Sequence, residues 1–271
     1  MVLNLTTGNF VPVPRDSLSR PASAKDAPEF ADAAHRYRSA SAFRTGADTY
    51  DSVRPGYPAE VVDLVAGRRT VLDLGAGTGK LTTRLLDAGH EVLALDPSPD
   101  MVRFLSRLGV PAWRATAEAT ALVDDAVDAV TCAQTWHWVD AAAACAELDR
   151  VVRPGGRVVL AWNNLDVSHP WILRLARIMH SGDIQRPGFL PEVHAPWRIV
   201  RELRTGWIQH LRTGDVHRLM HTRSYWLRSG EKIRDRMTRN LDWYLFDRLG
   251  FHEGQLLPIP YRTDAFVLER T

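Results

Sequence analysis

The most informative run of the chain is Val71-Leu72-Asp73-Leu74-Gly75-Ala76-Gly77-Thr78-Gly79-Lys80. The apolar residues up to Leu74 predict a buried strand, and the three alternating glycines predict a tight turn into a helix. The start of a helix exposes unpaired N–H groups and a partial positive charge, which suit an anionic group of a ligand. The run therefore predicts a nucleoside-type ligand at a strand-to-helix turn.

A second apolar run, residues 91–95, is followed by Asp96, 17 residues after Gly79. A carboxylate at this place can accept hydrogen bonds from a ribose diol. The alternative is a helix cap or a turn residue before Pro97, but Ser98 is the better placed cap. The dinucleotide fingerprint G-x-G-x-x-G needs its third glycine one residue later than Gly79, so the spacing disfavours a nicotinamide oxidoreductase.

The rest of the chain continues the alternation of strands and helices up to residue 163. Such alternation predicts βαβ units in a parallel sheet that is buried on both faces. The predicted strands are 70–74, 91–95, 110–113, 126–132 and 157–162, and the predicted helices are 80–88, 98–108 and 140–152. After residue 164 the rhythm breaks: we predict helices over 169–180 and 229–249, a loop or lid over 182–197, and strands over 205–211 and 261–268.

These patterns predict a flexible tail over 1–28 and one domain over 29–271. Within the domain we expect a core over 58–163, a cap or insertion over about 164–203, and the C-terminal part of the sheet over 204–271.

The composition is that of an ordinary soluble globular protein, with 271 residues, 45% of them apolar and 24% charged. A net charge of +2 gives no overall drive toward nucleic acid or an anionic membrane. The two cysteines, Cys132 and Cys145, lack the spacing of a metal site or a disulfide framework. We expect a cytoplasmic enzyme, monomeric or homodimeric, without a metal, a membrane segment or a nucleic-acid partner.

Four segments together resemble the motifs of class I S-adenosylmethionine-dependent methyltransferases. Residues 72–79 are similar to the first motif, Asp96-Pro97-Ser98 to the ribose-binding acid and its turn, Ala117-Glu118-Ala119 to the adenine-flanking segment, and Arg153-Pro154-Gly155-Gly156 to the turn before the fifth strand. Residues 50–58 and Ala133-Gln134-Thr135-Trp136-His137-Trp138 further resemble the trans-aconitate methyltransferase-like (methyltransferase type 11) group, whose members methylate small molecules, often at a carboxylate.

The resemblance implies a Rossmann-like α/β fold: a seven-stranded, mostly parallel sheet with helices on both faces, an antiparallel last strand, and a helical cap after the fifth strand. It implies S-adenosylmethionine (SAM) as cofactor and S-adenosylhomocysteine as product. The cofactor-binding residues carried over are Asp73, Gly75, Ala76, Gly77, Gly79, Asp96, Pro97, Ala117, Glu118, Gln134, Tyr50 and Arg54. One position departs from the family: Thr116 stands where many relatives carry an aspartate that contacts adenine, so its hydroxyl or Glu118 would take that place.

Residues 134–140 follow the fourth predicted strand and should lie at the carboxyl edge of the sheet, facing the methyl group. Trp136 and Trp138 could exclude water and contact the sulfonium by cation–π attraction, or they could pack under a loop. His137, the candidate catalytic residue, could act as a base, bind an anionic acceptor, or make a structural hydrogen bond. Tyr57 and Arg223 are further candidates for the acceptor site; the basic stretch around Arg223 could equally be a solvated helix face.

The function favoured by these residues is methyl transfer to a small-molecule acceptor, at a carboxylate or a hydroxyl. An RNA or protein methyltransferase would favour a larger basic surface, an added binding module or an Asn-Pro-Pro-Tyr-type loop. A non-catalytic SAM-binding protein stays open, because an intact glycine loop indicates binding and not turnover.

Overall fold

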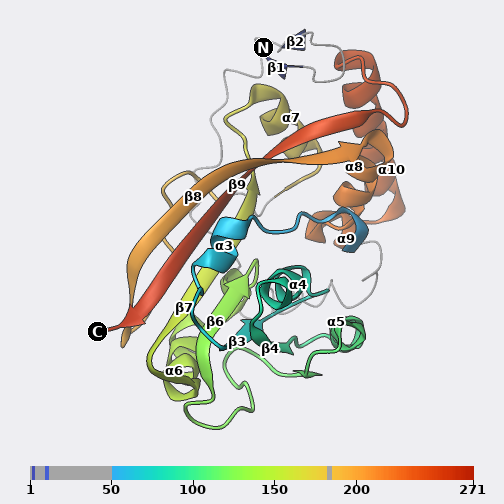
Figure 1. The fold of residues 1–271 in the computed structure, drawn as a ribbon. Coiled ribbons are helices and arrows are strands. Elements are labelled where there is room, and N and C mark those ends of the chain that lie inside the picture. Colours follow the sequence, from blue (N-terminus) through green and yellow to red (C-terminus); the bar gives the residue numbers. More distant parts are fainter. Residues whose placement is uncertain (1, 4–9, 12–50, 182–184) are drawn as a thin grey trace.

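The computed structural model describes residues 2–3, 10–11, 51–181 and 185–271. Its main sheet has seven strands in the order β5-β4-β3-β6-β7-β9-β8, and β9 alone runs against the others (Figure 1). This confirms the predicted fold class. The strands are β3 (Thr70–Leu74), β4 (Glu91–Leu95), β5 (Ala112–Trp113), β6 (Val127–Ala133), β7 (Val152–Leu165), β8 (Trp197–Arg212) and β9 (Leu256–Arg270), with a separate pair β1 (Val2–Leu3) and β2 (Phe10–Val11).

The first half of the sheet follows the predicted boundaries closely. Its helices are α3 (Ala59–Asp63), α4 (Lys80–Asp87), α5 (Pro99–Leu105), η2 (Ser106–Leu108), η3 (Trp136–Trp138) and α6 (Ala141–Val151). The side chain of Ser98 precedes α5 but makes no capping hydrogen bond, contrary to the sequence expectation. The predicted turn at 154–156 lies inside β7, where the pairing with β6 jumps from Val152 to Arg157.

Adjacent residues of the central strands belong to different cores. Leu72 and Val130 pack in the cluster that includes α6, whereas Val71 and Ala129 pack in the cluster that includes α3 and α4. Both faces of these strands are therefore buried, which explains their almost continuous apolar sequence.

The second half of the chain builds a helical cap from two insertions. Helix α7 (Pro170–Ile178) lies between β7 and β8 in sequence; α8 (Thr213–His221), α9 (Ser224–Arg228), α10 (Glu231–Asp242) and the π-helical η4 (Trp243–Arg248) lie between β8 and β9. One buried cluster joins α7, α8, α10 and η4 to β9, with Trp171, Leu219, Leu241 and Tyr261 among its members. Figure 1 shows these helices at the end of the long β8–β9 ribbon.

The cap differs from the sequence expectation in three ways. Residues 197–203, expected at the end of the cap, lie in β8. Helices α8 and α9 were not predicted, although the buried residues Val216, Leu219 and Met220 have helical spacing. The predicted helix over 229–249 is α10 continued by η4.

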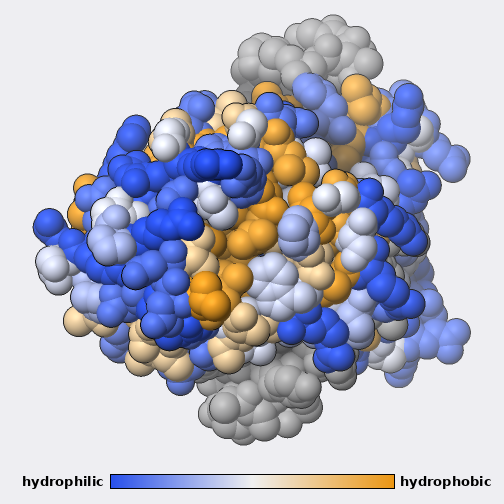
Figure 2. All heavy atoms as spheres, turned by 60° about the horizontal axis from the view of Figure 1, so that its bottom comes forward, coloured by the Kyte–Doolittle hydropathy of each residue, from blue (hydrophilic) through white to orange (hydrophobic). Residues whose placement is uncertain are grey.

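The surface carries exposed apolar side chains as well as charged ones. In the view from below, apolar residues form a band between hydrophilic margins (Figure 2). Large exposed apolar residues occur in loops, in β8 and in the cap, including Val123, Ile208 and Trp243. Single exposed residues of this kind are normal, so they do not indicate a partner by themselves.

Candidate cofactor and acceptor site

The glycine loop joins the end of β3 to the start of α4. Gly75, Gly77 and Gly79 have positive φ angles of 68°, 58° and 88°. A Cβ atom would lie 2.3 Å from Thr135 at Gly75 and 2.4 Å from Leu108 at Gly79, but would meet nothing within 4 Å at Gly77. Packing therefore requires glycine at the outer two positions, and the loop faces open space at the middle one, where a ligand can approach.

Asp96 holds the loop and the next turn together. Its Oδ2 accepts a hydrogen bond from the Gly77 N–H at 3.0 Å, and its Oδ1 accepts one from the Ser98 N–H at 2.8 Å. Burial raises the pKa of Asp96, and these two hydrogen bonds oppose that shift. A carboxylate has about four acceptor sites, so Asp96 can still accept hydrogen bonds from a ligand diol. Asp96 can therefore stabilise the turn and bind a ligand at the same time.

Asp73 lies beneath the loop and is 1% exposed. Its carboxylate accepts hydrogen bonds from the hydroxyls of Thr82 in α4, at 2.6 Å, and Thr131 in β6, at 3.0 Å. Burial raises the pKa of Asp73 to about 6, against the effect of these hydrogen bonds. Asp73 therefore ties β3 to its neighbours under the loop.

Asp73→Asn should change how stability depends on pH. The pKa of Asp73 is raised from 3.8 to about 6 in the folded state. Its stabilising contribution is therefore complete below about pH 4 and lost as the pH rises through about 6. Two pKa units correspond to about 3 kcal/mol. The unfolding free energy of Asp73→Asn should accordingly rise by about 3 kcal/mol relative to wild type between about pH 4 and pH 6.5. Urea denaturation at several pH values measures this difference, and parallel curves for the two proteins would contradict the assignment.

Three buried polar atoms lie in the turns that follow β3, β4 and β6. They are Thr78 Oγ1, Ser98 Oγ and Gln134 Oε1, and within the described ranges none has a hydrogen-bond partner. Buried polar atoms are normally paired, so these three fit a polar ligand at this edge. The ribose hydroxyls and the amino acid end of SAM provide such partners, and the open face of Gly77 leaves room for them.

Gln134 takes an unusual conformation directly after β6. Its φ is +52°, a region that non-glycine residues rarely adopt. Its backbone N–H donates to the Ala161 carbonyl at 2.8 Å, and its side-chain amide donates to the Asn163 carbonyl at 2.8 Å. These contacts fix the residue and orient its Oε1 atom. Strain of this kind often occurs at functional sites.

The residues expected near adenine lie on the segment before β6. Ala117 is 3% exposed, whereas Thr116 is exposed and bridges to Ala119. Glu118 Oε1 accepts a hydrogen bond from the Asp140 N–H at 2.8 Å, so it joins this segment to the start of α6. The carbonyl of Pro97 accepts from Arg114 at 3.4 Å.

The Trp-His-Trp run forms the short helix η3 after Gln134. Trp136 is 4% exposed, and its indole donates to the Glu192 carbonyl at 2.8 Å, which places it beneath the segment 185–196. His137 accepts a hydrogen bond at Nδ1 from Trp162 at 3.2 Å, and its ring lies 4.7 Å from that of Trp138. His137 and Trp138 are half-buried, and Thr135, just before this run, donates to the Gly75 carbonyl of the glycine loop at 3.1 Å.

Residues 51–57 connect the cofactor loop to the cap. Asp51 forms an ion pair with Lys80 at 3.3 Å, and the Gly56 carbonyl accepts from Asn163 at 2.8 Å. Arg54 donates to the hydroxyl and the carbonyl of Thr222, both at 2.9 Å, at the end of α8. These two hydrogen bonds join Arg54 to the cap.

Two further candidate residues, Arg223 and Tyr57, belong to the described part of the chain. Arg223 is buried and directly follows Thr222, the residue that Arg54 binds at one corner of the cap. Tyr57 is half-buried against the cluster under α3. Tyr50 lies outside the described residues.

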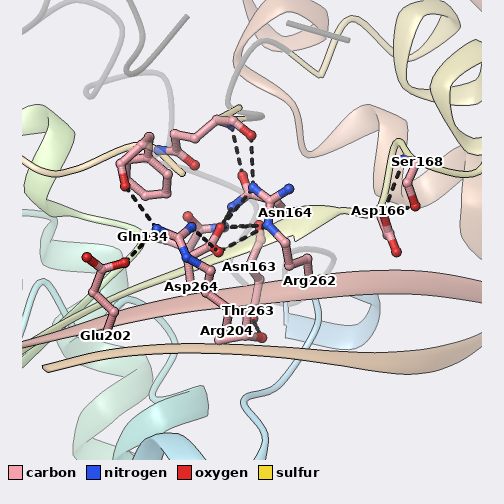
Figure 3. A network of polar contacts seen from close by, with 12 residues as sticks. Gln134, Asn163, Asn164, Asp166, Ser168, Glu202, Arg204, Arg262, Thr263 and Asp264 are labelled. Atoms are coloured by element: carbon pink, nitrogen blue, oxygen red, sulfur yellow. Dashed lines mark hydrogen bonds and ion pairs between the residues drawn. The ribbon is translucent and has the colours of Figure 1, made fainter. Parts of the chain in front are cut away.

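A buried polar network behind the site was not predicted (Figure 3). Asp264 is 0% exposed and binds the guanidinium groups of Arg204, at 3.0 Å, and Arg262, at 2.9 Å. Asn164 donates to the same carboxylate at 3.0 Å and accepts the Gln185 N–H at 3.1 Å. The network therefore joins the segment after residue 184 to the end of β7 and the middle of β9.

A second branch of the network reaches the cofactor edge. The Thr263 hydroxyl donates to Asn163 Oδ1 at 2.6 Å, and the indole of Trp207 donates to the Thr263 hydroxyl at 2.8 Å. Asn163 in turn accepts from Gln134. The sequence signal that could have revealed this branch is a pair of asparagines, 163 and 164, at the end of an otherwise apolar strand.

The described residues contain neither a membrane-spanning helix nor a metal-binding cluster. No helix there is long and apolar enough to cross a bilayer. The same ranges contain no group of three or more histidine, cysteine, aspartate or glutamate residues that could hold a metal ion.

The chain is similar to known methyltransferases. The methyltransferase domain family matches residues 72–160. An uncharacterised methyltransferase of Mycobacterium tuberculosis is 40% identical over 228 residues, which cover 82% of this chain and 92% of that protein. An uncharacterised methyltransferase-like protein of Schizosaccharomyces pombe is 30% identical over 244 residues, with coverages of 84% and 95%. A solved structure described as a type II methyltransferase from Anaeromyxobacter dehalogenans has a TM-score of 0.49 at 25% identity, covering 80% of this chain and 97% of that one.

The chain therefore belongs to the methyltransferases, and its cofactor is S-adenosylmethionine. When bound, this cofactor supplies an electrophilic methyl group on a sulfonium. The protein contributes orientation and a water-poor site.

Proposed function

We propose that this enzyme methylates an oxygen atom of a small-molecule acceptor, at a carboxylate or a hydroxyl. The observation that carries the proposal is the placement of His137 and Trp138 directly after Gln134, at the edge where the glycine loop and Asp96 meet. An imidazole can bind an oxygen atom, and an indole can contact a sulfonium and the apolar part of an acceptor.

The position of the cap favours a small molecule as the methyl acceptor. Residues 51–57 bind both α4 and the end of α8, so this segment links the two halves of the protein. An acceptor site at such a junction suits a small molecule better than a folded macromolecule. The resemblance of residues 50–58 and 133–138 to the trans-aconitate methyltransferase-like group supports the same class.

The remaining candidate residues would complete the same site. Arg54 and Arg223 would favour an acidic acceptor at the cap corner, and Trp136 would support the site from beneath. Ala117 and Glu118 would flank adenine, and Tyr50 would cover the cofactor. We further propose that the protein is a cytoplasmic monomer or homodimer. Its two buried free cysteines are compatible with a reducing compartment.

A thermal shift experiment tests the cofactor site first. SAM and S-adenosylhomocysteine at about 100 times their dissociation constants should each stabilise the protein by about 2.7 kcal/mol, which raises the melting temperature by roughly 5–10 °C. NAD is the matched control and should produce no rise. A rise with NAD alone would contradict the assignment of the loop.

Methyl transfer from labelled SAM tests the acceptor class. Panels of carboxylic acids and phenols should accept label, whereas a tRNA pool and a peptide pool should not. Transfer to either macromolecular pool alone would replace the proposal with an RNA or protein methyltransferase. SAM binding without transfer to any panel would favour a non-catalytic SAM-binding protein.

A further inference from the structure

Residues 51–57, here called the strap, are attached to several distant parts of the fold. Asp51 pairs at 3.3 Å with Lys80, the first residue of α4 after the glycine loop. Val53 is 0% exposed within the cluster that joins the cap helices to β9. The carbonyl of Val53 accepts a hydrogen bond from Gln209 in β8 at 3.1 Å. The strap therefore runs from the glycine loop into the core of the cap.

Asn163, in β7, holds the last part of the strap. Its side chain is buried, with an exposed fraction of 5%. The amide Nδ2 donates a hydrogen bond to the Gly56 carbonyl at 2.8 Å, and Oδ1 accepts one from the Thr263 hydroxyl at 2.6 Å. Its backbone carbonyl accepts from the side chain of Gln134 at 2.8 Å. The contacts with Gln134 and Thr263 can be followed in Figure 3. One residue thus contacts the strap, the last strand and the turn after β6.

The neighbours of Asn163 fix the orientation of its amide. The indole of Trp207 can only donate, and it donates to the Thr263 hydroxyl at 2.8 Å. The hydrogen of that hydroxyl is then available for Asn163 Oδ1. A backbone carbonyl can only accept, so the Gly56 carbonyl requires the N–H side of the amide. The side chain of Asn163 is therefore held in one orientation, with its donor toward the strap.

Gln134 connects Asn163 to the cofactor-binding edge of the sheet. The amide nitrogen of Gln134 is taken up by the Asn163 carbonyl. The other end of the amide, Oε1, is buried and has no hydrogen-bond partner in the part of the chain that the structure describes. A buried acceptor of this kind is normally paired, which fits a donor on the bound cofactor. A change in the position of Asn163 would therefore reach both Gln134 and the strap.

We propose that Asn163 is a positioning residue for the cofactor site, which holds the strap at the edge where Gln134 and the glycine loop lie. Docking of the strap and binding of SAM then favour each other. This coupling is reciprocal: SAM stabilises the docked strap by the same factor by which the docked strap strengthens SAM binding. The inference concerns cofactor binding and does not depend on the class of the methyl acceptor.

Docking of the strap can be measured on the full chain through a thiol introduced by Val53→Cys. The two side chains are close in size, and Val53 is fully buried. The new thiol should therefore react with an aromatic disulfide reagent only after the strap has left the cap. Saturating SAM should slow this reaction by about tenfold, whereas NAD should leave its rate unchanged. An equal rate with and without SAM would overturn the inference.

The native thiols distinguish undocking of the strap from unfolding of the protein. Cys132 in β6 and Cys145 in α6 are both buried. Global unfolding exposes all three thiols together, whereas undocking of the strap exposes only the one at position 53. One thiol should therefore react much faster than the other two. Reaction of all three at a single rate would contradict local undocking.

Asn163→Ala, made together with Val53→Cys, removes the donor to the Gly56 carbonyl. The thiol at position 53 should then react about tenfold faster, which is the effect of losing one hydrogen bond. Saturating SAM should slow the reaction again, because the bound cofactor favours the docked strap. A rate equal to that of Val53→Cys alone would show that Asn163 does not hold the strap.

Asn164→Ala is the matched control for a general loss of stability. Asn164 is the next residue of β7 and is 1% exposed, but its side chain donates to Asp264. This variant should lower the melting temperature and leave the rate at position 53 as it is in Val53→Cys alone. If Asn164→Ala accelerates the reaction as much as Asn163→Ala does, Asn163 has only a structural role and the inference fails.

Two substitutions of Thr263 test the orientation of Asn163 while Asn163 itself is kept. Thr263→Val retains the shape of the side chain and removes the hydroxyl that binds Asn163 Oδ1. It should accelerate the reaction at position 53, in the same direction as Asn163→Ala. Thr263→Ser retains the hydroxyl and should react at the rate of Val53→Cys alone. Equal rates for Thr263→Val and Thr263→Ser would overturn the role given to the amide of Asn163.

Discussion

Asp96→Ala should weaken SAM binding by about 10- to 100-fold. The variant removes the acceptor for the ribose diol, and a hydrogen bond to a charged group contributes about 1.5–3 kcal/mol. It also removes the acceptor of the Gly77 N–H, which shapes the loop at its open position. Both losses should therefore weaken SAM binding. Isothermal titration with SAM and with S-adenosylhomocysteine measures the change.

The control for this prediction is Asp87→Ala. Asp87 is an exposed acid at the end of α4, away from the loop. It carries the same charge, so its removal tests whether general electrostatic attraction explains the effect. The two variants should differ by at least about tenfold in affinity. Equal affinities for Asp96→Ala and wild type would reject the ribose assignment.

Asp264→Ala should be the most destabilising of these substitutions. The carboxylate is fully buried and binds Arg204, Arg262 and Asn164. Removing one partner of a buried ion pair leaves an uncompensated charge and costs about 3–5 kcal/mol. A loss of this size lowers the melting temperature by roughly 6–20 °C. Thermal and urea unfolding of the variant measure it.

Glu202→Ala supplies the contrast. Glu202 binds the same guanidinium of Arg204 at 2.8 Å, but its side chain is 43% exposed. Solvent screens such a pair, so Glu202→Ala should lower the unfolding free energy by less than about 1 kcal/mol. Similar losses for the two variants would show that burial of Asp264 does not decide its contribution.

The local sequence was sufficient to predict the half of the fold that contains the glycine loop. The strands over 70–74 and 91–95 have the predicted boundaries, because each is a short apolar run that ends at glycine or aspartate. The glycine loop was equally visible, since three alternating glycines have a direct geometric meaning. The predicted class of fold was also correct, because alternating strands and helices leave few arrangements.

The cap and the polar network depend on contacts between distant residues. Helices α8 and α9 were missed because the basic residues around Val216 and Leu219 suggested a charged surface. Asn164 and Asp264 are 100 residues apart, and neither residue alone indicates its partner. The sequence likewise left three roles open for His137. Its contact with Trp162, 25 residues away, becomes visible only once the fold is known.

The place of β9 has a consequence for the order of assembly. Strand β9 lies between β7 and β8, and its pairing with β7 joins Val158 to Leu268. Until those residues meet, β8 and β9 are not joined to the rest of the sheet. Bringing together residues so far apart in the chain costs entropy before any contact compensates for it. We therefore expect the pairing of β7 with β9 to be a late step in folding. During synthesis the half of the sheet that contains the glycine loop can form first, and the cap is completed only after the last strand has been made.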